Sequence, residues 1–330
     1  MSSLTLVRDI DTLPPTLKGG VVVMGNFDGM HRGHQALLHK ASALARATSC
    51  PLIMLTFEPH PRQLFNKTEP SFRLMPLTAK IACLQQFNAT CGLALKAVIA
   101  LRFTHRLASM RAQDFIQSIL CHALRTTHVF TGRDFRFGKQ RLGDRHMLAA
   151  CHAFSYHAID IVTMSDDETR VSSSLLRAWI AAGDVERATP FLHRPWTWRG
   201  HVIRGAQRGR KIGFPTANMR PPRHSLQPPY GVYIVKTRVP SLQPEGWLPA
   251  IANIGMRPTF QGTMPLLETH ILDDTVAASL PPLYGHIMYT SFISFLRQER
   301  AFPSPHALQQ RLQKDCEQAR LFWYHHAESL

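Results

Sequence analysis

Residues 21–34 read VVVMGNFDGMHRGH, and this stretch decides the fold of the first half of the chain. Its first four residues are a continuous apolar run, which predicts a strand buried on both faces of a sheet. A Gly-rich segment follows, and from about Gly33 the apolar residues recur at helical spacing. The stretch therefore predicts a strand, a tight loop and the start of a helix. The apolar face of that helix comprises Leu37, Leu38, Ala41, Leu44 and Ala45.

The same alternation of strand and helix continues downstream. Further strands are expected at 52–57, 98–101, 128–131 and 158–163, with helical stretches near 78–88 and 110–122. Near-continuous apolar strands that alternate with helices are typical of a parallel sheet covered on both faces. Ligands in such sheets bind beyond the carboxyl ends of the strands. We therefore expect an α/β domain with its site at that edge.

The pattern changes after Pro195, where strand-like runs are separated by Pro- and Gly-rich segments. Short strands broken by turn residues are typical of an antiparallel barrel or sandwich. We expect two domains, residues 1–188 and 189–330, joined near ATPFLHRPW (188–196). The strands expected in the second domain are 230–238, 248–254, 267–272 and 287–296, followed by a helix over about 306–324.

The composition excludes several classes of protein. Forty-five per cent of the 330 residues are hydrophobic and 18% are charged, as in folded rather than disordered chains. No apolar run approaches the ~18 residues of a membrane span, and the N-terminus lacks the apolar core of a signal peptide. Six scattered cysteines without a CxxC pair argue against a disulfide framework or a structural zinc site. The cysteine pattern favours the reducing cytoplasm.

The formal net charge is +16, and two windows hold most of it. Residues 101–150 carry a net charge of +6, and residues 199–238 hold nine Lys and Arg without any acid. The excess is rich in Arg and interleaved with Gly, which suits close contact with phosphates. Charge alone leaves two interpretations open, phosphate sites or solvated basic loops. A nucleic-acid-binding protein is a further alternative, although no Lys/Arg run or basic helix face supports it.

Two histidines, His31 and His34, flank Gly33 where the first helix is expected to begin. Unpaired N–H groups and the helix dipole make a helix N-terminus favourable for anions. Imidazole donors at that position bind phosphate and stabilise the charge that develops during its transfer. No Cys or Glu lies at zinc-ligand spacing nearby, so the pattern indicates phosphate chemistry rather than a metal centre.

The segment GNFDGMHRGH (25–34) resembles the HxGH box of the nucleotidyltransferase superfamily, in the form found in bifunctional riboflavin kinase/FMN adenylyltransferases (FAD synthetases). TFEPHP (56–61), GRDFRFGKQRLGD (132–144) and VSSSLLR (171–177) resemble the second, third and last boxes. The resemblance implies a Rossmann-like nucleotidyltransferase domain whose boxes surround ATP and FMN. The chain departs from the family at Leu175, where Arg is more common.

The reaction implied for this half is the attack of the FMN phosphate on the α-phosphorus of ATP. Positioning and charge neutralisation supply the catalysis, with no covalent enzyme intermediate. The resemblance makes His31 and His34 the catalytic residues and Asp28 a residue that orders the loop. Residues expected to bind the nucleotide or flavin are Gly25, Phe27, Asp28, Gly33, His60, Asp134, Phe137, Ser172, Ser173 and Arg177. Ser172 and Ser173 also suit a helix N-cap, and Phe135 or Phe137 suits either the flavin or the core.

The second half contains GAQRGRKIGFPTAN (205–218), which combines glycines and basic residues without matching a Walker P-loop. It resembles the GxxxGRxxGFPTAN segment of riboflavin kinases, which implies a six-stranded Greek-key barrel closed by a terminal helix. In that family the Thr and Asn of PTAN contact Mg²⁺-ATP, here Thr216 and Asn218, and oxygen ligands suit Mg²⁺. The cofactor-binding residues implied are Gly205, Arg210, Lys211, Gly213, Pro215, Thr216, Asn218 and Arg297.

Other kinase landmarks follow in order, namely GVY (231–233), NIGMRPTF (253–260), LETHILD (267–273), LYG (283–285) and FLRQERAF (295–302). The resemblance makes Glu268 the catalytic base, which takes a proton from the ribityl 5′-hydroxyl as it attacks the γ-phosphate. The chain departs from the family after Asp273, where a longer link, DTVAASLPP (274–282), leads to LYG.

The function implied is the phosphorylation of riboflavin to FMN and the adenylylation of FMN to FAD, with ATP and Mg²⁺ at both steps. The expected partners are the small molecules ATP, riboflavin and FMN, with neither nucleic acid nor a membrane. An alternative is that only one of the two halves is catalytically active. The oligomeric state is not indicated by the sequence.

Overall fold

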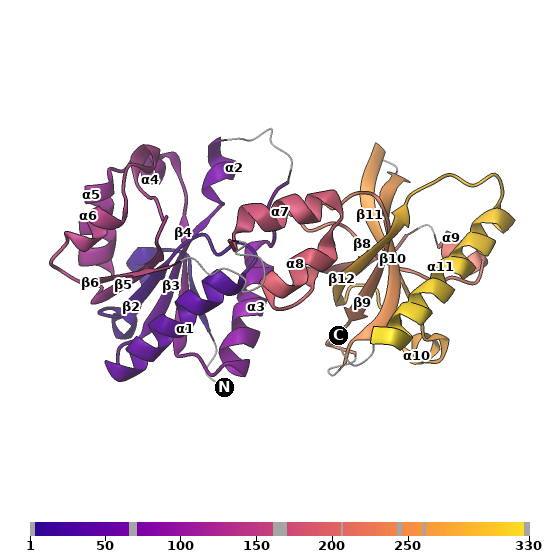
Figure 1. Cartoon of the computed structure of the whole chain (residues 1–330), viewed down its shortest axis with the longest axis horizontal. Coiled ribbons are helices and arrows are strands. Elements are labelled where there is room, and N and C mark those ends of the chain that lie inside the picture. Colours follow the sequence, from indigo (N-terminus) through magenta and orange to yellow (C-terminus); the bar gives the residue numbers. More distant parts are fainter. Residues whose placement is uncertain are drawn as a thin grey trace. The chain divides into compact units, whose positions relative to one another are not determined.

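The computed structural model describes residues 4–65, 71–160, 170–205, 207–242, 246–259 and 262–326. The chain forms two compact units, shown in Figure 1. The first comprises Met1–Pro70 and Leu77–Ser173, and the second comprises Ser71–Pro76 and Ser174–Leu330.

The first unit contains a six-stranded sheet, and all of its neighbouring strands are parallel. In spatial order its strands are β1 (Thr5–Val7), β4 (Leu95–Arg102), β3 (Leu52–Glu58), β2 (Val21–Met24), β5 (His128–Gly132) and β6 (Ser155–Ile159). From β2 the chain runs outward through β3 to β4, and then returns to add β5 on the other side of β2. The direction of winding therefore reverses between β2 and β5. Ligands bind at this kind of position in open α/β sheets.

Helix α1 (Arg32–Ala47) packs on β2, β3 and β5 through its apolar face, and Figure 1 shows it crossing the sheet. The other helices of the unit are α2 (Pro61–Phe65), α3 (Leu77–Thr90), α4 (His105–Ala108), α5 (Ala112–Phe115), a π-helical segment (Ile116–Ala123) and α6 (Arg145–Ala149). Single 3₁₀ turns lie at Ile10–Thr12, Pro15–Leu17 and Lys139–Arg141.

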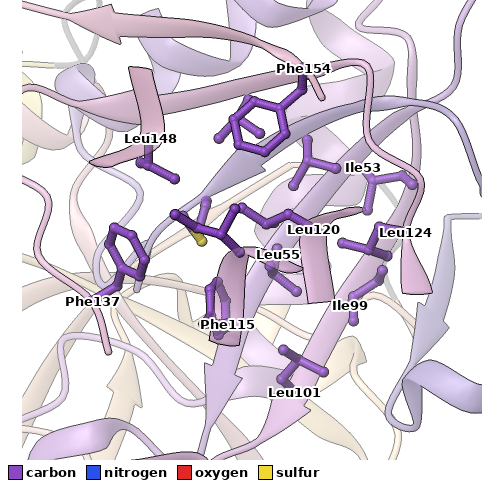
Figure 2. Close-up of a cluster of buried hydrophobic side chains, with 14 of the residues drawn as sticks. Ile53, Leu55, Ile99, Leu101, Phe115, Leu120, Leu124, Phe137, Leu148 and Phe154 are labelled. Carbon is purple, nitrogen blue, oxygen red and sulfur yellow. The ribbon is translucent and has the colours of Figure 1, made fainter. Parts of the chain in front are cut away.

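A buried apolar cluster joins one face of this sheet to α5, the π-helical segment and α6 (Figure 2). The labelled members are Ile53, Leu55, Ile99, Leu101, Phe115, Leu120, Leu124, Phe137, Leu148 and Phe154. Burial of one such side chain stabilises the fold by about 1.5–3 kcal/mol. The cluster therefore stabilises the sheet whose strand ends carry the predicted nucleotidyltransferase boxes.

The second unit contains a closed antiparallel barrel of six strands. Around the barrel these are β10 (Leu248–Thr259), β11 (Gly262–Ile271), β8 (Ala217–Met219), β7 (Trp196–Ile203), β12 (Ile287–Gln298) and β9 (Gly231–Arg238). Fully buried aromatic rings fill it, with Trp198 and Tyr233 centred 5.3 and 5.4 Å from Phe292. Its helices are α7 (Ser173–Ala182), α8 (Val185–Leu192), α9 (Arg208–Lys211), α10 (Asp274–Ser279) and α11 (Pro305–His326), of which α11 packs on β10.

A short segment from the first half of the sequence belongs to the second unit. Arg177 donates through Nε to the Phe72 carbonyl at 3.0 Å, and Trp196 donates to the Leu74 carbonyl at 2.8 Å. Contacts thus group residues 174–188 with the barrel, whereas the composition groups them with the first domain. The boundary between residues 188 and 189, which divides the chain by activity rather than by contacts, stays a prediction.

The expected fold class is confirmed, with a Rossmann-like parallel sheet, a closed barrel rather than a sandwich, and a C-terminal helix. The strand expected at 158–163 is β6, which begins earlier, at Ser155; residues 161–163 lie outside the described part. The helix expected over 110–122 is divided between α5 and the π-helical segment. No helix in the described ranges has the length and apolarity needed to cross a membrane.

Candidate active sites

The loop between β2 and α1 lies where the sheet reverses its winding, and its backbone is held tightly. Gly25 donates its N–H to the Leu55 carbonyl at 3.1 Å. Phe27 and Met30 are both buried with φ of 50°, a left-handed conformation that costs a non-glycine residue about 1–3 kcal/mol. The surrounding structure must therefore enforce the shape of this loop.

Two residues without a predicted role supply part of that constraint. The Nζ of Lys80 donates to the Asn26 carbonyl at 2.6 Å, and the hydroxyl of Thr56 donates to the same oxygen at 3.2 Å. Lys80 is only 5% exposed, and a buried ammonium is tolerated only when it is well bonded. The sequence contains a signal for the burial of Lys80, because it lies at helical spacing between Leu77 and Leu84, the other buried residues of α3.

The two histidines predicted to be catalytic lie together at the start of α1. His31 is the N-cap residue, and its ring stacks on that of His34 with centroids 3.6 Å apart and planes 20° apart. No acidic residue lies in the first turn of α1, and the positive end of a helix dipole favours anions. The structure therefore places two imidazoles where a phosphate is favoured.

The position of the His31 ring explains why residue 33 is a glycine. A Cβ at this position would lie 3.2 Å from both Cε1 and Nδ1 of the His31 ring, closer than nearly all real Cβ contacts. A side chain at residue 33 would therefore push against the His31 ring in its stacked position.

Gly33→Ala is expected to displace the His31 ring and to lower kcat for FAD formation from FMN by about 10–100-fold. The reason is that a misplacement of ~1 Å in a catalytic group lowers the rate by up to about 100-fold. Riboflavin phosphorylation should stay within about twofold of the unsubstituted protein. The two reactions are assayed separately by chromatography of the flavins. An unchanged rate of FAD formation would show that the ring position is not critical.

The first and last nucleotidyltransferase-like boxes meet at Asp28. The Ser173 hydroxyl donates to the Asp28 carbonyl at 2.8 Å, and Asp28 itself is buried. This placement fits the expected loop-ordering role of Asp28. Ser172 precedes Ser173 directly, whereas Arg177 belongs to the second unit and lies over the Phe72 ring. The nucleotide contacts of these three side chains stay predictions.

The second and third boxes follow β3 and β5, the strands on either side of β2. His60 follows β3, and its Nδ1 accepts from the Arg62 N–H at 3.2 Å. Asp134 follows β5 and forms an ion pair with Arg170. Three predicted boxes therefore lie at the carboxyl ends of three adjacent parallel strands.

The aromatic residues of the third box are packed into the apolar cluster. Phe137 is 5% exposed and its ring centroid lies 5.7 Å from that of Phe115. Phe135 stacks on Phe137 with the ring centroids 6.0 Å apart. Core packing accounts for the position of Phe137, and its flavin contact stays a prediction without support from this geometry.

The predicted kinase residues lie on the outside of the barrel. Glu268 of β11 is opposite Asn218 of β8 on one side and opposite Asn253 of β10 on the other. Residues directly opposite in antiparallel strands point to the same face. Asn253 is also opposite Val232, a member of the apolar cluster that includes Cys316 and Ala319 of α11. The three polar residues therefore share the face on which α11 packs.

Glycines shape the loop of residues 205–216. A Cβ on Gly205 would overlap the Asn218 amide, and a Cβ on Gly209 would overlap the Phe214 carbonyl oxygen. Gly213 has φ of 85°, which a residue with a side chain rarely adopts. The three glycines of the motif are thus required by close approach or by backbone conformation.

Two hydrogen bonds fix the end of the same loop. His270 donates through Nδ1 to the Pro215 carbonyl at 2.9 Å, and Gln309 of α11 donates to the Ile212 carbonyl at 3.3 Å. Thr216 follows Pro215 directly and is half-buried. Arg210 is exposed on α9, and the side chain of Lys211 lies outside the described part.

Asn218 has the properties of a cation ligand. Its side chain is 4% exposed, and its Oδ1 has no hydrogen-bond partner among the described residues. A buried acceptor without a partner costs about 1–3 kcal/mol. No group of three or more His, Cys, Asp or Glu in the described ranges could hold a metal ion. A cation at Asn218 would therefore take most of its ligands from phosphate oxygens and water.

Arg297, predicted to bind the nucleotide, is engaged elsewhere in the fold. Its Nε lies 3.0 Å from both oxygens of Asp315, a fully buried residue of α11, and its Nη2 lies 2.5 Å from Oδ2. Arg311 contributes a second guanidinium, with Nε 2.8 Å from Asp315 Oδ1. The structure thus gives Arg297 an ion pair that ties β12 to α11, and its nucleotide contact stays a prediction.

Comparison with known proteins identifies the family to which the chain with these two sites belongs. Residues 13–175 match the family model of FAD synthetase, and residues 192–323 match that of riboflavin kinase. The bifunctional riboflavin kinase/FMN adenylyltransferase of Haemophilus influenzae is 35% identical over 321 residues, which are 97% of this chain and 99% of the relative. The chain belongs to the bifunctional riboflavin kinase/FMN adenylyltransferase family. It is an enzyme that combines the two activities in one polypeptide.

Other members of this riboflavin kinase/FMN adenylyltransferase family agree over the same length. The relative named so in Escherichia coli is 35% identical over 322 residues, covering 97% of this chain and 98% of its own. A crystal structure described as a macrolide-efflux protein from Streptococcus pneumoniae matches with a TM-score of 0.80 and 26% identity. That match covers 96% of this chain and 99% of the other, so both units have counterparts in it.

The riboflavin kinase half contains one further functional candidate, Arg257 of the segment NIGMRPTF (253–260). Arg257 donates through Nη2 to Glu268 at 2.8 Å and through Nη1 to Glu299 at 2.7 Å. The sequence indicates the face on which Arg257 lies, because a residue four positions after Asn253 in a strand is on the same face of β10. Its partners, however, come from two other segments of the chain.

Proposed function

We propose that His31 and His34 catalyse the adenylyl transfer, and that Glu268, Thr216 and Asn218 catalyse the phosphoryl transfer. The observation that carries the first assignment is the stacked histidine pair at the N-terminus of α1. The observation that carries the second is the register that sets Asn218 opposite Glu268. The two reactions use separate residues, so each is expected to proceed without the other.

In the adenylyl transfer, an FMN phosphate oxygen attacks the α-phosphorus of ATP, and the bond to the pyrophosphate oxygen breaks. The attacking oxygen is already ionised, so no base is required. The imidazole N–H groups and the first N–H groups of α1 hold the α-phosphate and stabilise the charge on it. The fixed loop of residues 25–30 supplies the orientation that converts binding into rate.

In the phosphoryl transfer, the ribityl 5′-oxygen attacks the γ-phosphorus while its proton passes to the Glu268 carboxylate. Thr216 and Asn218 would hold Mg²⁺ that arrives with ATP, and the ion would supply neutralisation of the phosphate charge. The buried Oδ1 of Asn218 and the hydroxyl of Thr216 are hard oxygen ligands, which suit this ion. The loop of residues 205–215 positions both ligands.

Asn218→Ala is expected to raise the Mg²⁺ concentration needed for half-maximal riboflavin phosphorylation by about 10-fold or more, in line with the loss of other groups that support a metal. The Mg²⁺ dependence of FAD formation from FMN should not change. Titration of Mg²⁺ at saturating ATP in each reaction measures both effects. An unchanged Mg²⁺ requirement in the kinase reaction would remove Asn218 from the metal site.

We also propose that the two basic windows, residues 101–150 and 199–238, bind nucleotides rather than nucleic acid. We propose the cytoplasm as the location of the enzyme. The two windows include the third box, 132–144, and the glycine-shaped loop of residues 205–216. Incubation with riboflavin and Mg-ATP should yield FMN first and FAD later, resolved by chromatography. FMN without FAD at all times would mean that the adenylyltransferase half is inactive, and neither product would mean that the kinase half is inactive.

A further inference from the structure

One guanidinium joins the proposed catalytic base to a second carboxylate on the outer face of the barrel. Arg257 donates to Oε2 of Glu268 through Nε at 3.0 Å and through Nη2 at 2.8 Å. Its Nη1 donates to Oε1 of Glu299 at 2.7 Å and to the Met256 carbonyl at 3.0 Å. Glu268 is on β11 and Glu299 follows β12, so Arg257 connects three segments of the chain.

Two neighbours of Arg257 on β10, Gly255 and Asn253, lie next to the Glu299 carboxylate. A Cβ on Gly255 would overlap the Glu299 carboxylate, so a larger residue there would displace that carboxylate from its position beside Arg257. In one orientation of its amide, Asn253 donates to Glu299 Oε1 at 3.3 Å. In the other orientation it accepts from Arg257 Nη2 and donates to the Gly231 carbonyl at 3.2 Å. Alternate residues 253, 255 and 257 of one strand thus build a single network.

The charges in this network depend on one another. The side chains of Arg257 and Glu268 are each 29% exposed, and that of Glu299 is 34% exposed. Burial alone would lower the pKa of Arg257, but the hydrogen bonds and charges of Glu299 and Glu268 together outweigh burial and raise it. Two partly buried carboxylates that face one site repel each other unless a cation lies between them. A guanidinium holds two acceptors in fixed directions, which an ammonium does not.

The hydrogen bonds also distinguish the two oxygens of Glu268. Both bonds from Arg257 go to Oε2, and no residue in the described ranges bonds to Oε1. With the second orientation of Asn253, all five donors of the guanidinium are used within the protein. Arg257 then has no donor left for an ATP phosphate, whereas Glu268 has one oxygen left to accept a proton.

We propose that Arg257 is the positioning residue of the kinase site, which fixes Glu268 through Oε2 so that Oε1 accepts the riboflavin hydroxyl proton. Glu299, in turn, holds Arg257. The proton passes to Oε1 as the oxygen–phosphorus bond forms and the bond from the γ-phosphorus to ADP breaks, and it then leaves to solvent. The inference rests on the proposed role of Glu268 as the base.

The test compares Arg257→Gln, Arg257→Lys, Glu268→Gln and the double variant Arg257→Gln/Glu268→Gln in the full-length enzyme. Arg257→Gln is expected to lower kcat for riboflavin phosphorylation by about 10–100-fold, with KM for ATP within about twofold. Arg257→Lys should restore part of that loss because it returns the positive charge. In the Glu268→Gln background, Arg257→Gln should have no additional effect, because a positioning residue acts only through the group it positions.

Several outcomes would overturn this inference. Equal losses from Arg257→Gln with and without Glu268 would show independent action, and a raised KM for ATP at unchanged kcat would show a phosphate ligand. Glu268→Gln with normal kcat would instead refute the role of Glu268, so the two failures are distinguishable. If Arg257→Gln does not fold, as judged by riboflavin binding, Glu299→Gln keeps the cation and releases only its anchor. That variant is expected to lower kcat about 3–10-fold, and an unchanged kcat would contradict the proposal.

Discussion

His31→Ala is expected to lower the rate of FAD formation from FMN by about 10²–10³-fold, the usual cost of removing one donor from a developing charge. Riboflavin phosphorylation should stay within about twofold of the unsubstituted enzyme. The reason is that His31 stacks on His34 at the N-terminus of α1, while the kinase residues belong to the other compact unit. The measurement is kcat for each reaction, with FMN and ATP in one assay and riboflavin and ATP in the other.

A matched control for His31 is available on the same helix. His39 is exposed on α1, and its ring lies edge-on to Phe87 with centroids 5.3 Å apart. His39→Ala should leave both rates within about twofold, since no phosphate site is proposed there. Loss of both reactions in a well-folded His31→Ala variant would contradict separate sites, and a normal rate of FAD formation would contradict the role of the histidine pair.

Glu268→Gln is expected to lower the rate of FMN formation by about 10²–10⁴-fold, the typical contribution of a positioned general base. Adenylylation of added FMN should not change. The glutamine has the same shape but is a far weaker base than the carboxylate, so the loss reports proton transfer rather than packing. The measurement is kcat for riboflavin phosphorylation at saturating Mg-ATP.

The control for Glu268 is another carboxylate of the same unit. Glu317 is exposed on α11 and accepts a hydrogen bond from Gln313 at 2.9 Å. Glu317→Gln should alter neither reaction by more than about twofold. If Glu268→Gln phosphorylated riboflavin at a normal rate, the base would have to be another group.

The sequence predicted the elements whose signals are local. The apolar run at 21–24 is β2, and the helical pattern after Gly33 is α1. Strand β7 is not among the predicted strands because Gly200 interrupts the alternation of the buried residues Trp196, Trp198 and Val202. The placement of residues 71–76 with the barrel was missed because it depends on long-range hydrogen bonds from Arg177 and Trp196.

The candidate sites show the same division between local and long-range information. Family resemblance supplied the residues that we propose as catalytic, but not their partners in the fold. The bonds of Lys80 to the first loop and of Arg257 to Glu299 join segments 42 or more residues apart in sequence. The ion pair between Arg297 and Asp315 depends on how α11 packs, which no local pattern specifies. Burial of Phe137 likewise depends on Phe115 of a neighbouring helix.

We propose that the two catalytic sites of the chain work independently. Mixing the His31→Ala and Glu268→Gln variants with riboflavin and Mg-ATP, and resolving the flavins over time, tests this independence. Each variant alone should form FAD from riboflavin at least about 100-fold more slowly than the unsubstituted enzyme. The mixture should accumulate FMN from the first variant and then FAD from the second. A mixture that forms FMN but no FAD, although Glu268→Gln adenylylates added FMN, would contradict the claim.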